Sequence, residues 1–362
     1  MRVRVELSEQ QDARAHAREH AADRLPDRTP YGLHRVATGD VDVVFRPPLP
    51  PAARTLSRVV RNRLGGYDVV GATAGALDRD RARADVVLCM DERAGFPAAL
   101  GPGPPVVSHL IWVGRPDSYG RARRAVVHRA LDRLAGAFTT TPSLRDDLLA
   151  AWDLDPSRVV AVRPGIDTGF FPPQPFPTST DETSPDPTPV VVSAGDDRFR
   201  DHGTLVAALD GLRRRGLPVR LELATTLADA QVPAGLGVLH RRRMEGGMRA
   251  LYRRASVVAV ALQPTTRGSG TSVVLEAAAS ARPVVATRTP AMAALVADGE
   301  RGLLVEPGDP TAFGDAVAAL LADPDRARRM GAAARTWVEG AHTSAHMADD
   351  VRRVLRGALR PS

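Results

Sequence analysis

Short apolar runs alternate with helix-length segments along most of the chain. The first series comprises Val41 to Phe45, Tyr67 to Gly71, Val86 to Met90, Val106 to Leu110, Ala137 to Thr140 and Val159 to Val162. A second series comprises Val190 to Ala194, Val219 to Ala224, Gly237 to Leu239, Val257 to Leu262, Val284 to Ala286 and Leu303 to Val305. Because buried parallel strands read as short apolar runs connected through helices, both series predict βαβ units.

A Pro-rich segment separates the two series. Residues 171–189, FPPQPFPTSTDETSPDPTP, show no apolar period and predict an extended linker. We therefore expect an α/β protein of two Rossmann-like doubly wound domains, 1–170 and 190–343, with a last helix within 344–362. Two such domains facing across a cleft would hold a ligand outside the carboxyl ends of their strands.

The stretch from residue 251 to 289 predicts a phosphate site. A buried strand feeds a turn that contains Gly268 and Gly270, and a helix over Ser272 to Ser280 follows. Free backbone N–H groups and the positive end of a helix dipole attract anions, and glycine lets a ligand approach the backbone closely. Glu276 lies about one turn into this apolar helix and could bind a sugar hydroxyl. A solvated surface glutamate is the alternative.

Other polar candidates lie at predicted strand ends. Arg198 and Arg200 follow the strand that ends at Ala194, and an arginine fork suits a phosphate; the alternative is a surface ion pair with Asp197 or Asp201. His109 ends another strand, and because a lone histidine is more often structural, that interpretation is the alternative to a functional one. Four further residues are acceptor-side candidates: Trp112 and Arg115 on the loop after His109, and Asp91 and Glu92 after the strand that ends at Met90.

Composition narrows the class of protein. The chain has 362 residues, 43% hydrophobic and 25% charged, which suits two soluble domains. The net charge of +7 comes entirely from arginine, and no zinc-finger spacing or aromatic stacking motif accompanies it, so we expect no nucleic-acid partner. Arginine clusters such as 213–215 leave peripheral contact with an anionic membrane open as an alternative that nothing else supports.

The sequence also bears on the cellular compartment, on disulfide bonds and on metal binding. The N-terminal sequence lacks the apolar core of a signal peptide, and we expect a cytoplasmic protein. The lone Cys89 excludes an internal disulfide. Asp78 and Asp80 have an Asp-x-Asp spacing within an arginine-rich stretch, where a solvated loop is favoured over a magnesium site, so we expect no metal and no cofactor.

Several motifs resemble the family-4 glycosyltransferases with the GT-B fold. Matches to the donor-binding segment of that family are Leu251 to Arg253, Pro264, Leu275 to Ala277 and Pro283 to Thr287. Further similar segments are Phe138 to Val162, Arg163 to Phe171 (RPGIDTGFF) and Asp298 to Gly308 (DGERGLLVEPG). The likeness covers residue 138 to the C-terminus.

The resemblance implies an enzyme that moves a sugar from a nucleotide-sugar donor to a small-molecule or glycan acceptor with retention. It implies a donor site made of Arg198, Arg200, Gly268, Ser269, Gly270, Thr271, Ser272 and Glu276, in which Glu276 binds the ribose. It also implies a catalytic role for His109, in contact with the transferred sugar, and a last helix that returns to the first domain.

Two departures from the family pattern keep alternatives open. The family has two glutamates with seven residues between them, and Gly268 stands where the first would be. The Gly-Gly turn after the first strand is also absent, with Tyr31 to His34 as a displaced equivalent. The alternatives are a nucleotide-sugar 2-epimerase on the same fold and a non-catalytic partner protein.

Overall fold

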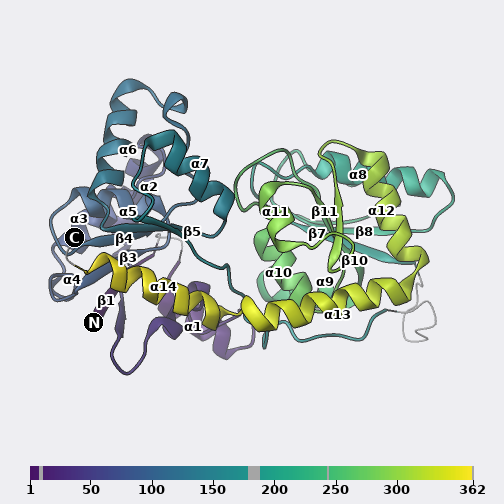
Figure 1. Ribbon diagram of the computed structural model, residues 1–362, viewed down its shortest axis with the longest axis horizontal. Helices are drawn as coiled ribbons and strands as arrows, with labels where there is room; N and C mark the ends of the chain where they lie inside the picture. Colours follow the sequence, from purple (N-terminus) through teal and green to yellow (C-terminus); the bar gives the residue numbers. More distant parts are fainter. Residues whose placement is uncertain (8–10, 178–187, 243, 361–362) are drawn as a thin grey trace. The chain divides into compact units, whose positions relative to one another are not determined.

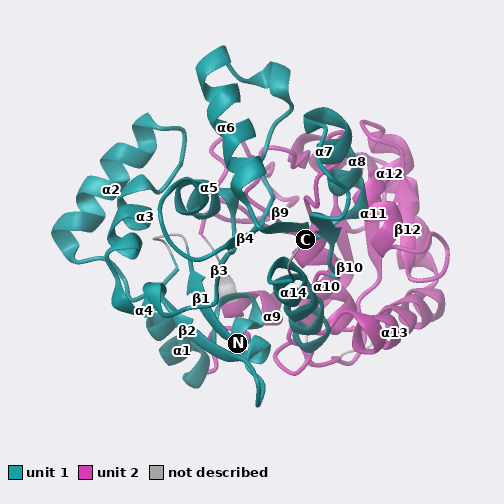
Figure 2. Ribbon diagram, turned by 60° about the vertical axis from the view of Figure 1, so that its left-hand side comes forward, with its two compact units in different colours: residues 1–22, 27–163, 344–362 teal, residues 23–26, 164–343 magenta. Residues whose placement is uncertain are grey.

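The computed structural model describes residues 1–7, 11–177, 188–242 and 244–360 (Figure 1). The chain forms two compact units (Figure 2). The first comprises residues 1–22, 27–163 and 344–362, and the second comprises residues 23–26 and 164–343.

The first unit is built on a parallel six-stranded sheet. Its strand order is β2-β1-β3-β4-β5-β6. The strands are β1 (Arg2–Glu6), β2 (Asp42–Phe45), β3 (Val86–Cys89), β4 (Val106–His109), β5 (Gly136–Thr139) and β6 (Val159–Ala161). The helices are α1 (Ala13–Ala21), η1 (Pro30–Val36), α2 (Pro51–Arg63), α3 (Val69–Ala76), α4 (Arg79–Ala82), α5 (Glu92–Leu100), η2 (Pro116–Ser118), α6 (Arg121–Arg133), α7 (Pro142–Trp152) and α14 (Ser344–Ala358).

One predicted strand of the first unit is wrong and one observed strand was not among the apolar runs. The run Tyr67 to Gly71 leads into α3, because the Asp68 carboxylate caps that helix through the N–H of Gly71 at 2.8 Å. Strand β1 lies between β2 and β3, yet it carries Arg4 and Glu6. Both side chains are buried beside opposite charges, Arg4 against Asp78 and Glu6 against Arg81.

The last helix of the chain is part of the first unit. Met347, Val351 and Leu355 of α14 pack in one apolar cluster with Val107 and Phe138 of the sheet. Arg163, next to β6, holds the helix through a two-pronged ion pair with Asp350, with N–O distances of 2.7 and 2.9 Å. The first unit is therefore completed by residues far away in the sequence.

The second unit contains the other parallel six-stranded sheet. Its order is β12-β11-β10-β7-β8-β9, and all six strands match the predicted runs to within two residues at each end. They are β7 (Val190–Ala194), β8 (Arg220–Ala224), β9 (Gly237–His240), β10 (Ala255–Val260), β11 (Val284–Thr287) and β12 (Gly302–Val305). The helices are α8 (His202–Arg214), η3 (Glu245–Gly247), α9 (Met248–Arg254), α10 (Thr271–Ala279), α11 (Pro290–Leu295), α12 (Pro310–Ala322) and α13 (Pro324–Ala341).

The boundary between the units lies at residues 163 and 164, ahead of the expected linker. Phe170 and Phe171 pack in the apolar cluster of the second unit with Tyr252. Residues 178–187 of the expected linker lie outside the described residues. Within the described ranges, no helix combines the length and the apolar character that a membrane crossing requires.

Candidate functional site

The candidate donor site lies where β10 leads through a glycine turn into α10. Gly270 has φ of +84° and precedes the first residue of the helix. A Cβ atom at Gly270 would lie 2.6 Å from Cγ1 of Val260, so both the backbone angle and the close approach require glycine. The N-terminal N–H groups of α10, which have no intrahelical acceptors, therefore stand at the carboxyl edge of the sheet.

Arg200 is the cation of this site. Its side chain is 4% exposed, and its Nε donates to Oδ2 of Asp197 at 2.9 Å. A Cβ at Gly195 would lie 2.1 Å from Nε, so the guanidinium occupies space that only glycine leaves open. A Cβ at Gly270 would lie 3.5 Å from Nη1, which places the other prong of the fork beside the start of α10.

Asp197 joins the arginine to the glycine turn. Its Oδ1 accepts a hydrogen bond from Oγ of Ser269 at 3.0 Å, while Oδ2 accepts from Arg200. The turn after β7 and the turn after β10 are thus tied together by one carboxylate. The ion pair that the sequence offered as an alternative for Arg200 is present, and it aims the guanidinium at the proposed phosphate position.

Two buried polar atoms at this point have no hydrogen-bond partner within the described part of the chain. They are Nη1 of Arg200 and Oγ1 of Thr271. A buried donor without a partner costs free energy, roughly 1–3 kcal/mol. Burial lowers the pKa of Arg200, and Asp197 opposes that shift, so the guanidinium keeps its charge. An anion at the start of α10 would satisfy both atoms.

Glu276 lies further along α10 and is held by a tyrosine. The Tyr252 hydroxyl, which is fully buried, donates to Oε2 of Glu276 at 2.7 Å. Burial raises the pKa of Glu276 to about 7, against the opposing effects of the Tyr252 hydrogen bond and the Arg200 charge. Glu276 as a residue is partly exposed.

The remaining donor candidates make fewer contacts that would fix them at the candidate site. Arg198 is exposed, and its guanidinium carbon lies 4.9 Å from the ring centroid of Phe199. Ser272 is exposed in the first turn of α10, and the Gly268 carbonyl accepts from the N–H of Thr271 at 3.2 Å. The structure therefore brings together Arg200, Ser269, Gly270, Thr271 and Glu276, whereas Arg198 stays outside that group.

His109 ends β4 in the first unit and is neutral. Its ring stacks on Phe138 with centroids 4.8 Å apart and planes within 3°. Burial lowers the pKa of His109 to about 4, opposed by a hydrogen bond with the Met90 backbone. Its Nδ1 is buried without a partner among the described residues. Packing against Phe138 thus fixes the ring, while Nδ1 makes no hydrogen bond within the described residues.

The acceptor-side candidates lie after β3 and β4, and a hydrogen bond joins two of them, Glu92 and Trp112. Both carboxylate oxygens of Glu92 accept from backbone N–H groups, those of Ile111 and Trp112, at 3.0 and 2.9 Å. Burial raises the pKa of Glu92 to about 7, against the opposing effect of these backbone hydrogen bonds. Asp91 caps α5 through the N–H of Ala94 at 2.9 Å, and Arg115 pairs with Asp147 at 3.3 Å. Glu92 therefore positions the loop that carries Trp112.

Sequence reasoning missed two residues of the candidate donor site as participants. Tyr252 matched the family motif, but nothing in its spacing indicates a bond to Glu276, which is 24 positions away. Asp197 entered only as a partner for Arg198 or Arg200, whereas it also binds Ser269, 72 positions away. The only sequence signal for these two residues was a polar side chain within a motif that is otherwise apolar, for Tyr252, or Gly-rich, for Asp197.

Each aspartate of the Asp-x-Asp pair forms an ion pair with an arginine. Asp78 pairs with Arg4, and Asp80 pairs with Arg2 at 3.2 Å. Within the described ranges, no group of three or more His, Cys, Asp or Glu side chains is arranged to hold a metal ion.

Comparison with known proteins assigns the family. Residues 188–323 match the family model described as "Glycosyl transferases group 1". The D-inositol 3-phosphate glycosyltransferase of Xylanimonas cellulosilytica is 30% identical over 304 residues, which cover 75% of this chain and 67% of that protein. The chain belongs to the group 1 glycosyltransferases. The corresponding protein of Corynebacterium glutamicum is 32% identical over 230 residues, covering 58% of this chain and 54% of that protein. This glycosyltransferase chain thus spans about half the length of the first curated relatives that it matches.

Solved structures confirm the GT-B fold of this glycosyltransferase. Sucrose-phosphate synthase from Thermosynechococcus elongatus superposes with a TM-score of 0.72 at 18% identity over 98% of both chains. Anabaena HepE in complex with UDP and glucose superposes with a TM-score of 0.64 at 15% identity, over 98% of this chain and 99% of that chain. At such identities the likeness establishes the architecture of two Rossmann-like domains.

Proposed function

We propose that this glycosyltransferase moves a sugar from a nucleotide sugar to a small-molecule acceptor, with retention and without a metal ion. The observation that carries the proposal is Nη1 of Arg200 at the N-terminus of α10, a buried donor without a partner among the described residues, with Glu276 on the same helix. A fixed cation, a helix terminus and a carboxylate together match a diphosphate followed by a ribose. The UDP complex of the structural neighbour supports the nucleotide class.

The diphosphate is the leaving group, and its charge grows as the sugar departs. Arg200 and the N-terminal turn of α10 are already oriented by Asp197 and by the Gly270 turn. Groups held in place before the reaction stabilise developing charge without reorganising. In this proposal they supply the electrostatic stabilisation that a metal ion provides elsewhere. Thr271 contributes to the same phosphate its hydroxyl, which has no partner within the described ranges.

Glu276 binds the ribose hydroxyls in its ionised form. The Tyr252 hydroxyl donates a hydrogen bond to Oε2 of Glu276. In this proposal, Oε1 accepts from the nucleoside. A ribose hydroxyl that donates to the carboxylate favours ionisation, so nucleotide binding is expected to lower the pKa of Glu276. Arg198, Gly268, Ser269 and Ser272 are assigned to the donor by the family resemblance.

The acceptor side is assigned to the first unit. We propose that His109 offers a neutral imidazole to the transferred sugar, a role that its low pKa permits at neutral pH. Trp112 and Arg115 are proposed to contact the acceptor, with Glu92 holding the loop that carries Trp112 and Asp91 capping α5 beside it. The name shared by the relatives, D-inositol 3-phosphate glycosyltransferase, supports a small phosphorylated polyol as the acceptor class.

A thermal-shift panel of nucleotides and nucleotide sugars tests the donor site first. A ligand that binds only the folded state raises the melting temperature, by an amount that grows with ligand concentration. We expect at least one nucleotide sugar to stabilise the protein and Glu276→Ala to abolish most of that shift. Glu300→Ala is the matched control, because Glu300 is an exposed glutamate of the same unit. No shift with any donor would refute the nucleotide site.

Product analysis then separates the alternative functions. The stabilising donor is incubated with inositol phosphates and other small polyols, and the products are identified by mass spectrometry and NMR. A new glycoside with the anomeric configuration of the donor supports retaining transfer. Donor turnover without an acceptor would indicate an epimerase, and binding without turnover across the panel would indicate a non-catalytic protein in which Gly268 has replaced the first family glutamate.

A further inference from the structure

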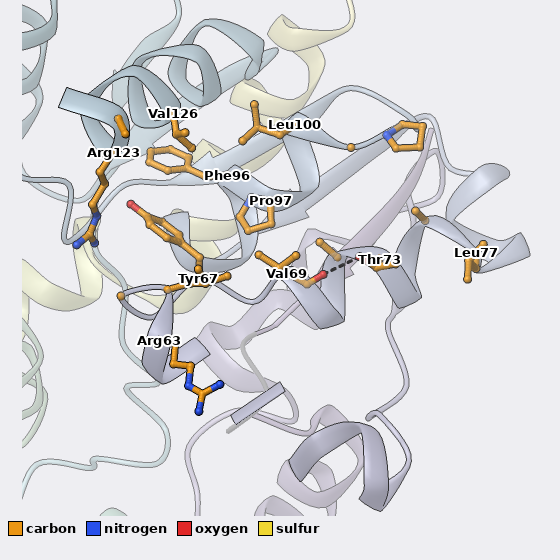
Figure 3. Close-up of a pocket in the computed structure, with 17 residues that line it drawn as sticks. Arg63, Tyr67, Val69, Thr73, Leu77, Phe96, Pro97, Leu100, Arg123 and Val126 are labelled. Atoms are coloured by element: carbon orange, nitrogen blue, oxygen red, sulfur yellow. Dashed lines mark hydrogen bonds between the residues drawn. The ribbon is translucent and has the colours of Figure 1, made fainter. Parts of the chain in front are cut away.

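A groove in the first unit lies outside the residues assigned to the reaction. It has a volume of about 830 Å³ and is lined by residues from the end of α2, the loop before α3, and helices α3, α5 and α6. Figure 3 shows Phe96, Leu100 and Val126 along one side and Val69 and Thr73 along the other. A volume of this size lies within the range of small-molecule sites.

Apolar side chains of this groove face water. Leu77 is 83% exposed, Val126 52%, Leu64 48% and Val69 40%. Scattered exposed apolar residues are common, but these four line a single hollow together with buried Phe96. A contiguous apolar hollow of this kind marks a binding surface.

The charged residues that line the groove are both arginines. Arg63 and Arg123 are among its 17 lining residues, which include no aspartate or glutamate. The guanidinium carbon of Arg123 lies 5.5 Å from the ring centroid of Tyr67 and 5.1 Å from that of Tyr119, so this cation is fixed at one end. Figure 3 shows Arg63 and Arg123 toward the Tyr67 end and Leu77 at the other end.

We propose that this groove binds one single-chain anionic amphiphile, with its hydrocarbon chain along α3, α5 and α6 and its head group at Arg63 and Arg123. Charge complementarity selects an anionic head, and the apolar hollow selects an alkyl chain. The lining is concave, with side chains on two facing sides, which suits one enclosed chain better than a flat bilayer surface.

Equilibrium dialysis of the full chain with radiolabelled dodecanoate, at concentrations below its self-association, tests the proposal. We expect one molecule bound per protein. Decanoate should bind about tenfold more weakly, because two buried methylene groups are lost. Dodecyltrimethylammonium, with the same chain and the opposite charge, should bind at least tenfold more weakly than dodecanoate.

Three variants locate the ligand. Arg63→Glu should weaken dodecanoate binding at least tenfold, whereas Arg58→Glu, also an exposed arginine of α2 but outside the lining, should change it less than twofold. Thr73→Trp should fill the hollow and abolish binding, with an unchanged melting temperature because Thr73 is exposed on α3.

Each remaining outcome would overturn the proposal. No binding, equal binding of the cationic amphiphile, or affinity independent of chain length would each exclude the site. Binding to phosphatidylglycerol vesicles without binding of monomeric dodecanoate would assign the surface to a membrane instead. Displacement by an acidic amphipathic peptide, with no dodecanoate binding, would assign it to a partner protein.

Discussion

The pH dependence of donor binding follows from the position of Glu276. Burial raises its pKa to about 7 in the free protein, and the proposed contact with ribose hydroxyls needs the carboxylate. Binding should therefore strengthen as pH rises toward 7 and level off above it. Below pH 7 the affinity should fall by about tenfold for each pH unit, because the ligand must first displace a proton.

Titration calorimetry between pH 5.5 and 8.5 measures this effect. The ligand should be the nucleotide sugar that gives the largest thermal shift, because its diphosphate is a diester without the phosphate monoester group that titrates near pH 6. At pH 6.5, runs in buffers of different ionisation enthalpy should report net proton release on binding. Tyr252 and Arg200 do not titrate in this range, since Tyr252 has a pKa well above its ordinary value and Arg200 stays charged.

Substitution of Glu276 separates this reasoning from other sources of pH dependence. Glu276→Gln should weaken binding at pH 8 by roughly 1.5–3 kcal/mol, since a charged hydrogen-bond acceptor is replaced by a neutral one. It should also remove most of the pH dependence below 7. Glu300→Gln should leave both unchanged. Equal affinity of wild type at pH 5.5 and 8, or of wild type and Glu276→Gln at pH 8, would refute the assignment.

Four further predictions concern the candidate donor site and the proposed reaction. Arg200→Lys should weaken donor binding at least tenfold in calorimetry, because an ammonium cannot pair with Asp197 and a phosphate as a fork; unchanged affinity would remove Arg200 from the site. Tyr252→Phe should shift the midpoint of the pH dependence upward, since the hydroxyl lowers the pKa of Glu276; a downward shift would contradict that sign. Gly270→Ala should lower stability by about 1–3 kcal/mol in urea unfolding, through strain at positive φ and contact with Val260; a neutral effect would show that the turn adapts. Transfer activity should survive EDTA, and loss restored by Mg²⁺ or Mn²⁺ would disprove the metal-free proposal.

Local sequence patterns determined most of the fold. Continuous apolar runs such as Val284 to Ala286 are buried on both faces of a parallel sheet, and that requirement leaves a readable signal in a single segment. The glycine turn and the start of α10 were likewise predictable, because the left-handed angle at Gly270 strongly favours glycine. The candidate phosphate position followed from these local features.

Tertiary structure decided the elements whose residues depend on distant partners. Strand β1 reads as alternating valine and charge, and it is buried because Arg4 and Glu6 meet Asp78 and Arg81. The run Tyr67 to Gly71 has the apolar character of a strand, but the cap at Asp68 starts a helix instead. Short apolar runs do not by themselves distinguish a buried strand from a buried helix.

The chemistry of the site also depends on partners that the sequence does not pair. An isolated Glu276 on a helix would be an ordinary acid; burial beside Tyr252 raises its pKa to about 7. An isolated Arg200 would be a mobile surface cation, whereas Asp197 and the missing Cβ of Gly195 hold it beside α10. Desolvation and hydrogen-bond geometry arise only when segments far apart in the chain pack together, so the sequence determined which groups were present and the tertiary structure determined their charge and direction.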